Sequence, residues 1–168
     1  TLTRADGGLC LCGLDYTKYR IDGGGWASYT GPFTIAGEGT HTIEYYSADH
    51  LSNLETTHSQ TVHVDNTPPT TTLTIGIPQY TDLYSNLYVA SWTPFTLSAV
   101  DGGSGVAQTN YRIHSATYDS GWLIYTGPFT LTGLAEDTYI VEYKSTDNLG
   151  NVEPTNAKTV ILDSKMAM

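Results

Sequence analysis

Acidic and amide side chains follow several of the segments that we interpret as β-strands. Asp101 opens the turn Asp-Gly-Gly-Ser-Gly, Asp147 and Asn148 follow a later strand, and Asp65 and Asn66 precede two prolines. If these loops meet at one end of a two-sheet fold, their carboxylate and amide oxygens converge, and hard oxygen ligands of that kind suit Ca²⁺. The alternative is that each side chain hydrogen-bonds its own backbone within a turn. No loop has the regular spacing of an EF-hand.

Aromatic side chains recur around two tryptophans. A flat ring that is exposed stacks on the apolar face of a sugar, so a group of exposed rings predicts a carbohydrate-binding platform. The alternative is that the same rings are packing residues, because they recur beside a repeated Gly-Pro-Phe. The candidate platform residues are Trp26, Tyr29, Tyr118, Trp122 and Tyr125.

Two pairs of opposite charges recur along the chain. Arg20 is followed by Glu44, and Arg112 is followed by Glu142 at a similar distance in the sequence. Each residue lies on the outward phase of its expected strand, and the strands of each pair should be neighbours. We therefore expect two cross-strand ion pairs, each contributing roughly 0–1 kcal/mol to stability, with a structural and not a catalytic role.

Other residues with chemical potential do not assemble into a catalytic motif. Cys10 and Cys12 lie in Leu-Cys-Leu-Cys-Gly, and two cysteines without a second pair leave a cross-link, a metal site and a pair of reduced thiols equally open. The five histidines are scattered, and the sequence has no His-Glu-x-x-His, Gly-x-Ser-x-Gly or phosphate loop. We therefore expect no enzymatic activity.

These residues sit on a repeat that organises the whole chain. The block Tyr-Thr-Gly-Pro-Phe-Thr at 29–34 returns letter for letter at 125–130, an offset of 96 residues. Tyr-Arg-Ile returns after 92 residues, and Glu-Tyr-x-Ser-x-Asp at 44–49 returns at 142–147 after 98. A unit of about 95 residues is one small β-sandwich domain.

Turn signals separate short, alternating segments in each unit. In the second unit we expect strands at 72–75, 95–100 and 159–162, with others around Tyr111 and Val141, and a longer variable connection at 77–92. No window has the period of a long amphipathic helix. Pro68 and Pro69 form a short, stiff spacer between residues 1–66 and 67–168.

The repeated blocks resemble the tandem immunoglobulin-like repeats of secreted bacterial and archaeal surface proteins. The resemblance covers nearly the whole chain and implies two Ig-like β-sandwiches whose role is that of a spacer, an adhesive stalk segment or an accessory module. It also implies that Tyr45 and Tyr143 hydrogen-bond back to the corners before their strands. Ser47 and Ser145 stand where such domains carry cysteine, so we expect packing alone, and no disulfide, to hold each sandwich.

Composition and charge narrow the classes of function. Seven Lys and Arg against seventeen Asp and Glu give a net charge of -10, which argues against a binder of nucleic-acid backbones. Residues 1–66 carry three cations and eight anions and residues 67–168 carry four and nine, so each unit carries -5 and resists clumping. No apolar run is long enough to span a bilayer.

The first unit has no counterpart for the first strand of the second, because Thr1-Leu2-Thr3 aligns with Thr96-Leu97-Ser98. Either the chain is a piece of a longer array, or another subunit donates the strand. The sequence thus predicts an all-β, rod-like, extracellular module of a stalk, surface layer or fibre, whose partners are other copies, neighbouring domains or glycans. The runner-up is an accessory carbohydrate-binding module of a secreted hydrolase.

Overall fold

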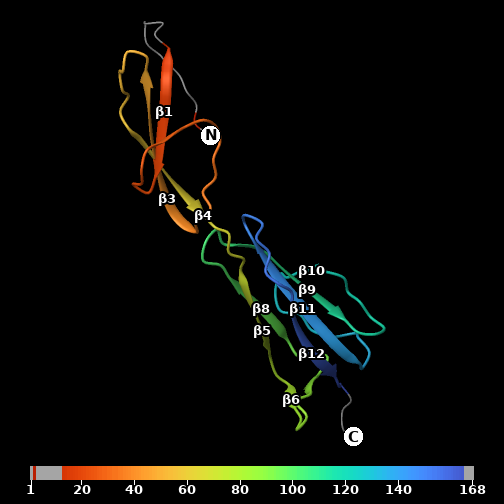
Figure 1. The fold of residues 1–168 in the computed structure, drawn as a ribbon. Helices are drawn as coiled ribbons and strands as arrows, with labels where there is room; N and C mark the ends of the chain where they lie inside the picture. The colour runs from red at the N-terminus through yellow and green to blue at the C-terminus, as the bar shows by residue number, and fades with distance from the viewer. Residues whose placement is uncertain (1, 3–12, 165–168) are drawn as a thin grey trace. The chain divides into compact units, whose positions relative to one another are not determined.

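The computed structural model describes residue 2 and residues 13–164, and it is built entirely from β-strands and their connections. Within this described part of the chain there is no helix long and apolar enough to cross a membrane. The chain divides into two compact units, Thr1–Asp65 and Asn66–Met168, one residue before the boundary that the repeat predicts (Figure 1). Cys10 and Cys12 lie outside the described residues.

Unit 1 is described as a single four-stranded sheet with the order β2-β1-β3-β4. Its strands are β1 (Leu14–Ile21), β2 (Ala27–Ser28), β3 (Gly39–Asp49) and β4 (His58–Val64), and all neighbouring pairs are antiparallel. The described residues therefore show one layer of the sandwich that the sequence predicts. The segment that aligns with the second unit's Phe95–Val100 lies outside them except for Leu2, so the absence of a first strand stays a prediction.

Unit 2 is a two-sheet sandwich. A six-stranded sheet has the order β10-β9-β11-β12-β7-β6, and β5 pairs with β8 in the second sheet. The bounds are β5 (Thr70–Ile75), β6 (Gln79–Thr81), β7 (Leu87–Val89), β8 (Phe95–Val100), β9 (Val106–His114), β10 (Leu123–Ile124), β11 (Thr138–Asp147) and β12 (Asn156–Leu162).

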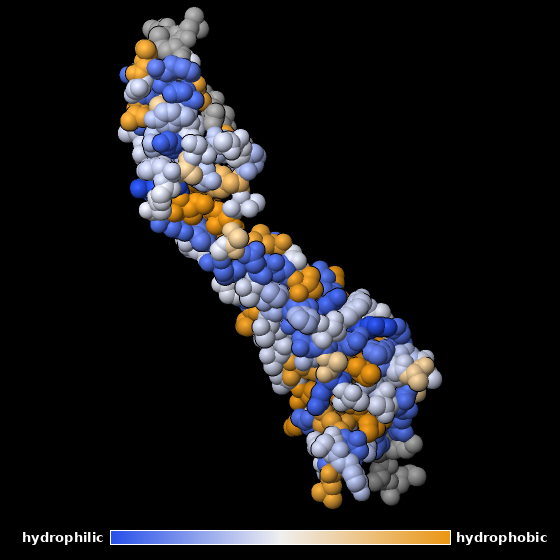
Figure 2. Space-filling view, in the orientation of Figure 1, coloured by the Kyte–Doolittle hydropathy of each residue, from blue (hydrophilic) through white to orange (hydrophobic). Residues whose placement is uncertain are grey.

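Alternation along the strands decides which side chains enter the core of unit 2. In β11, Tyr139, Val141 and Ser145 are buried while the residues between them are more exposed, because successive side chains of a strand point to opposite faces. The core joins Phe95 of β8 to Ile113 of β9 and to residues of β7, β11 and β12. Outside this core, apolar and polar residues are interspersed over the face drawn in Figure 2.

The pairing of β7 with β12 is parallel, unlike every other strand pair of unit 2. Tyr88 lies opposite Ile161, and the backbone N–H of Asp163 donates to the carbonyl of Val89 at 2.9 Å. β5 pairs with β8 in the small sheet, whereas β6 and β7, which follow β5 in the chain, join the large sheet beside β12. The first strands of unit 2 therefore contribute to both sheets.

A buried polar network joins the two sheets of unit 2. The Thr71 hydroxyl on β5 donates to Glu153, whose carboxylate also accepts the backbone N–H of Thr71 at 3.1 Å and of Ser145 at 2.7 Å. Because the single Thr71 proton goes to Glu153, Ser145 must donate to Thr71 at 2.6 Å, and Thr109 on β9 to Ser145 at 2.8 Å. The expectation that packing alone holds this sandwich is therefore wrong.

Unit 1 repeats only part of this network. Thr17 and Ser47 hydrogen-bond at 2.9 Å, as Thr109 and Ser145 do in unit 2. Glu55 matches Glu153 in the repeat, but its side chain is 40% exposed and lies 3.6 Å from His58. The described residues of unit 1 thus bring no counterpart of Thr71 to this glutamate, which stays near the surface.

This difference predicts unequal effects of one substitution in the two units. Glu153→Gln should destabilise unit 2 by about 2 kcal/mol. Both carboxylate oxygens of Glu153 accept hydrogen bonds, so the NH₂ group of glutamine would face another donor whichever oxygen it replaces. Glu55→Gln is the matched control and should change the stability of unit 1 by less than about 0.5 kcal/mol. Urea unfolding with separate NMR signals for each unit measures both, and equal losses would contradict the network's role.

Candidate functional site

Asp147, which the sequence marks as a candidate calcium ligand, caps a turn whose design recurs at Asp49. In Asp147–Asn151, one carboxylate oxygen of Asp147 accepts the backbone N–H groups of Leu149 and Asn151, and the other accepts the Asn151 amide at 2.6 Å. Asp49 caps its turn through Leu51 and Asn53 in the same way. These are the contacts of the turn-capping alternative.

A third copy of this turn was not recognised from the sequence. Asp82 accepts the backbone N–H groups of Tyr84 and Asn86 and the Asn86 amide, each at 2.9 Å. The residue before the final Asn has a positive φ in all three turns, namely Ser52, Ser85 and Gly150. The shared pattern Asp-x-x-Ser/Gly-Asn was available as a signal.

Two of the predicted calcium ligands do come together within unit 2. An oxygen of Asp101 lies within 4.8 Å of one of Asp147, and the Asn148 amide donates to the carbonyl oxygens of Ser104 and Gly105, which ties the two loops together. Asp101 accepts the backbone N–H groups of Gly103 and Gly105 through one oxygen. Its other oxygen is buried with no hydrogen-bond partner among the described residues.

The remaining two predicted ligands stand at the division of the chain. Asp65 is the last residue of unit 1 and Asn66 is the first of unit 2. Binding of Ca²⁺ by this set of five residues stays a prediction.

The predicted carbohydrate platform separates into packing residues and partly exposed rings. Tyr29 is only 7% exposed and meets Tyr19 and Phe33 edge to face at 6.3 Å, while Tyr19 and Phe33 stack at 4.2 Å. Tyr29 therefore belongs to a packed aromatic cluster and has no exposed face for a sugar.

Unit 2 contains the same aromatic cluster. Tyr125 lies edge to face against Tyr111 and Phe129 at 6.4 Å, and Tyr111 stacks on Phe129 at 4.0 Å. Both units thus contain the same three-ring packing motif. For these rings, packing is the alternative to sugar binding that the sequence leaves open.

The tryptophans and Tyr118 are partly exposed, at 36% for Trp26, 40% for Trp122 and 37% for Tyr118. Arg20 lies over the ring of Trp26 at 4.7 Å and Lys144 over that of Trp122 at 4.6 Å, so a cation already covers one face of each indole. Sugar binding by these rings stays a prediction.

The arginine and glutamate pairs lie on neighbouring strands. Arg20 is directly opposite Glu44 and makes two hydrogen bonds to it, at 2.7 and 2.8 Å. Arg112 is opposite Glu142 but lies closer to Asp119, at 2.6 Å against 3.4 Å. The guanidinium of Arg112 holds the pKa of the Asp119 carboxyl well below its usual range. Asp119 was not recognised from the sequence because its partner depends on the turn before β10.

The corner before the long strand differs from what the resemblance implies. Tyr139, not Tyr143, donates its hydroxyl to the corner, at 2.8 Å from the carbonyl oxygen of Ala135. Tyr139 stands at the start of β11 beside the corner, whereas Tyr143 lies four residues, or roughly 13 Å, further along the strand.

A histidine takes the place of this tyrosine in unit 1. His41 lies at the start of β3, and its ring reaches the carbonyl oxygen of Gly37 at 3.0 Å and the carboxylate of Asp22 at 2.7 Å. A Cβ on Gly37 would lie 2.9 Å from the imidazole, so only glycine admits the ring here. Both partners of the ring are acceptors, so both hydrogen bonds form together only when His41 is protonated, and the geometry favours the imidazolium form.

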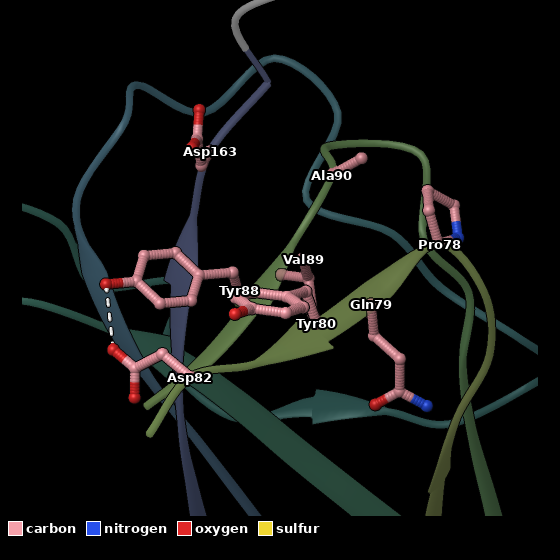
Figure 3. A pocket seen from close by; sticks show the side chains of 8 residues that line it. All are labelled: Pro78, Gln79, Tyr80, Asp82, Tyr88, Val89, Ala90 and Asp163. Atoms are coloured by element: carbon pink, nitrogen blue, oxygen red, sulfur yellow. Dashed lines mark hydrogen bonds between the residues drawn. The ribbon is translucent and has the colours of Figure 1, made fainter. Parts of the chain in front are cut away.

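Unit 2 contains a ligand-sized pocket of about 440 Å³. It lies between the hairpin formed by β6 and β7 and the residue after β12 (Figure 3). The variable connection at 77–92 supplies most of its lining. The residues are Pro78, Gln79, Tyr80, Asp82, Tyr88, Val89, Ala90 and Asp163.

The comparisons with known proteins are sparse. A scan against protein-family models finds no match, and a search of curated proteins also finds none. One similar solved structure is described as Clostridium thermocellum CbhA fibronectin(III)-like modules, with 11% sequence identity, coverage of 92% of this chain and 81% of that chain, and a TM-score of 0.40.

The histidine corner predicts a pH dependence of stability that is confined to unit 1. Asp22 and the carbonyl of Gly37 raise the pKa of His41 above 6.5, so its contribution is complete below pH 6.5 and is lost as pH rises through the raised value. Hydrogen bonds from His41 and Thr42 lower the pKa of Asp22 below 3.8, so its contribution is present above pH 3.8 and is lost on acidification. The pair stabilises unit 1 most between these two values.

Hydrogen exchange of peptides from each unit, followed from pH 5.5 to 8.5 and corrected for the intrinsic exchange rate, measures this effect. Protection of β3 should fall toward high pH in the wild type and stay level in His41→Gln. Unit 2 is the internal control, because burial raises the pKa of Tyr139 above 10 and keeps its corner neutral throughout. A wild-type profile as level as that of the variant would contradict the assignment.

Proposed function

We propose that this chain is a non-catalytic structural or adhesive module of an extracellular protein, which spaces or links surface components in a stalk, surface layer or fibre. The support is that its recurring charged and aromatic residues are engaged in holding the strands together. The arginine pairs connect neighbouring strands, the capping aspartates close turns, and the three-ring clusters pack in both units.

The observation that carries the proposal is the parallel pairing of β7 with β12. If a longer protein is pulled along its chain, tension reaches β7 through its N-terminal side and β12 through its C-terminal end. Parallel strands that are pulled from opposite ends are loaded in shear, so the hydrogen bonds between them resist together instead of breaking one after another. The bond from Asp163 to Val89 closes this pairing at 2.9 Å.

A runner-up function is that of an accessory carbohydrate-binding module, in which Trp26 and Trp122 contact sugar. The cations over both indoles and the packing of Tyr29 favour the structural role, because they leave fewer ring faces available to stack on a ligand.

Force spectroscopy on the chain placed between marker domains tests the structural role. We expect two unfolding events, releasing about 220 Å for the 65 residues of unit 1 and about 350 Å for the 103 residues of unit 2. Asp163→Pro removes the N–H that bonds to Val89 and should lower the unfolding force of unit 2. Asp163→Asn keeps the N–H and should leave the unfolding force of unit 2 unchanged. Extension of unit 2 without a resolved force peak would contradict the proposal that this unit resists tension.

We also propose that Ca²⁺ binds at the Asp101 and Asp147 loops of unit 2, with Asn148 as a further ligand. Their oxygen chemistry and the approach of Asp101 to Asp147 support this proposal. Calcium at a hundredfold excess over its dissociation constant should stabilise the protein by about 2.7 kcal/mol and raise its melting temperature. Asp101→Asn, which still accepts the turn N–H groups, should lose this response and Asp163→Asn should keep it; the same response in both variants would place the ion elsewhere.

A further inference from the structure

The pocket of unit 2 is assembled from parts of the chain that are distant in sequence. β6 and β7 form a hairpin closed by the Asp82–Asn86 turn, and β7 pairs in parallel with β12. This pairing brings Asp163 beside the hairpin, where its backbone N–H donates to Val89. The pocket walls are therefore held by backbone hydrogen bonds on both sides.

Aromatic rings and carboxylates dominate the lining. The rings of Tyr80 and Tyr88 lie 6.3 Å apart at an angle of 37°, and in the view of Figure 3 the Tyr88 ring lies between Asp82 and Asp163. None of the eight lining residues is a lysine, arginine or histidine. Tyr80 is 66% exposed, so its ring is accessible from solvent.

Hydrogen bonds already made inside the pocket leave it rich in acceptors. The hydroxyl of Tyr88 donates to Asp82 at 3.4 Å, and the amide nitrogen of Gln79 donates to the carbonyl oxygen of Ile75 at 3.0 Å. The Tyr88 hydroxyl proton and one of the two Gln79 amide hydrogens are thus directed to protein groups, while the Gln79 amide oxygen and the carboxylates can only accept. A ligand that only donates hydrogen bonds complements this lining better than a sugar hydroxyl, which both donates and accepts.

The electrostatic character of the pocket agrees with its hydrogen-bonding character. Hydrogen bonds from Asn86 lower the pKa of Asp82, so its carboxylate is ionised at neutral pH. Burial, and then the charge of Asp82, raise the pKa of Tyr88, so its phenol stays neutral. A cation beside these groups gains attraction both from the carboxylates and from the faces of the rings.

We propose that this pocket binds a primary ammonium group, presented as a lysine side chain on a partner of the module. The Tyr80 ring supplies a face for the cation, Asp82 and Asp163 supply the countercharge, and the exposed ring of Pro78 offers apolar surface to the alkyl part of the side chain. This proposal is independent of the load-bearing role, because a module without an ammonium site still links its neighbours.

NMR titration of the full chain with N-acetyl-lysine N-methylamide tests the proposal. Signals of the hairpin and of Asp163 should shift with a dissociation constant on the order of 1 mM, and the shifts should weaken as salt is added. The norleucine analogue has the same alkyl chain without the ammonium and should leave these signals in place. n-Butylamine, a free monoamine with the same alkyl length as the lysine side chain, distinguishes a small-molecule source of the same group from a peptide: tighter binding of n-butylamine would overturn the lysine assignment.

Variants of single side chains localise the binding. Tyr80→Leu and Asp163→Asn should each weaken binding of the lysine analogue about threefold or more, while retaining the dispersed spectrum of the folded chain. Tyr84→Leu is the matched control, because Tyr84 lies on the same hairpin, is 87% exposed and does not line the pocket, so its affinity should equal that of the wild type. Unchanged affinity in both pocket variants, equal binding of the norleucine analogue, or binding of cellobiose in place of the lysine analogue would overturn the proposal.

Discussion

Glu153 accepts hydrogen bonds from both sheets of unit 2, and the sandwich depends on that contact. The carboxylate is buried, so each of its oxygens needs donors, and Thr71, Ser145 and Asn156 supply them. Since Thr71 belongs to the small sheet and Ser145 to the large one, the requirement to satisfy one carboxylate also sets the register between the sheets. A directed chain of hydroxyl groups, from Thr109 through Ser145 to Thr71, connects the same two sheets.

Unit 1 shows which features of the repeat are local and which depend on a second layer. The three-ring cluster and the arginine pair recur because they need only neighbouring strands of one sheet and the segment that follows. The corner and the glutamate differ, since His41 replaces Tyr139 and Glu55 remains near the surface. One repeat therefore produces a unit whose corner is closed by a titratable histidine and another whose corner is closed by a tyrosine.

The two proposals for unit 2 depend on different parts of it, one on the sandwich and the other on the β6–β7 hairpin. Load-bearing follows from the pairing of β7 with β12, which belongs to the sandwich. The ammonium pocket follows from the β6–β7 hairpin, which has no counterpart among the described strands of unit 1. Asp163 contributes to both, through its backbone N–H to the strand pairing and through its side chain to the pocket, so its Pro and Asn variants separate the two roles.

Alternation and repetition in the sequence by themselves determined the all-β class, the strands at 72–75, 95–100 and 159–162 within a few residues, and the opposition of Arg20 to Glu44, because these properties depend on period and on pairing between adjacent strands. Only the tertiary structure decided that Tyr139 closes the corner, that Asp119 is the nearer partner of Arg112, and that Tyr29 is packed inside. The pocket was equally out of reach of the sequence, since Asp163 meets Tyr80 and Tyr88 only through the parallel pairing of strands some seventy residues apart. Such contacts depend on which strands become neighbours, and hydrophobic period carries no information about that choice.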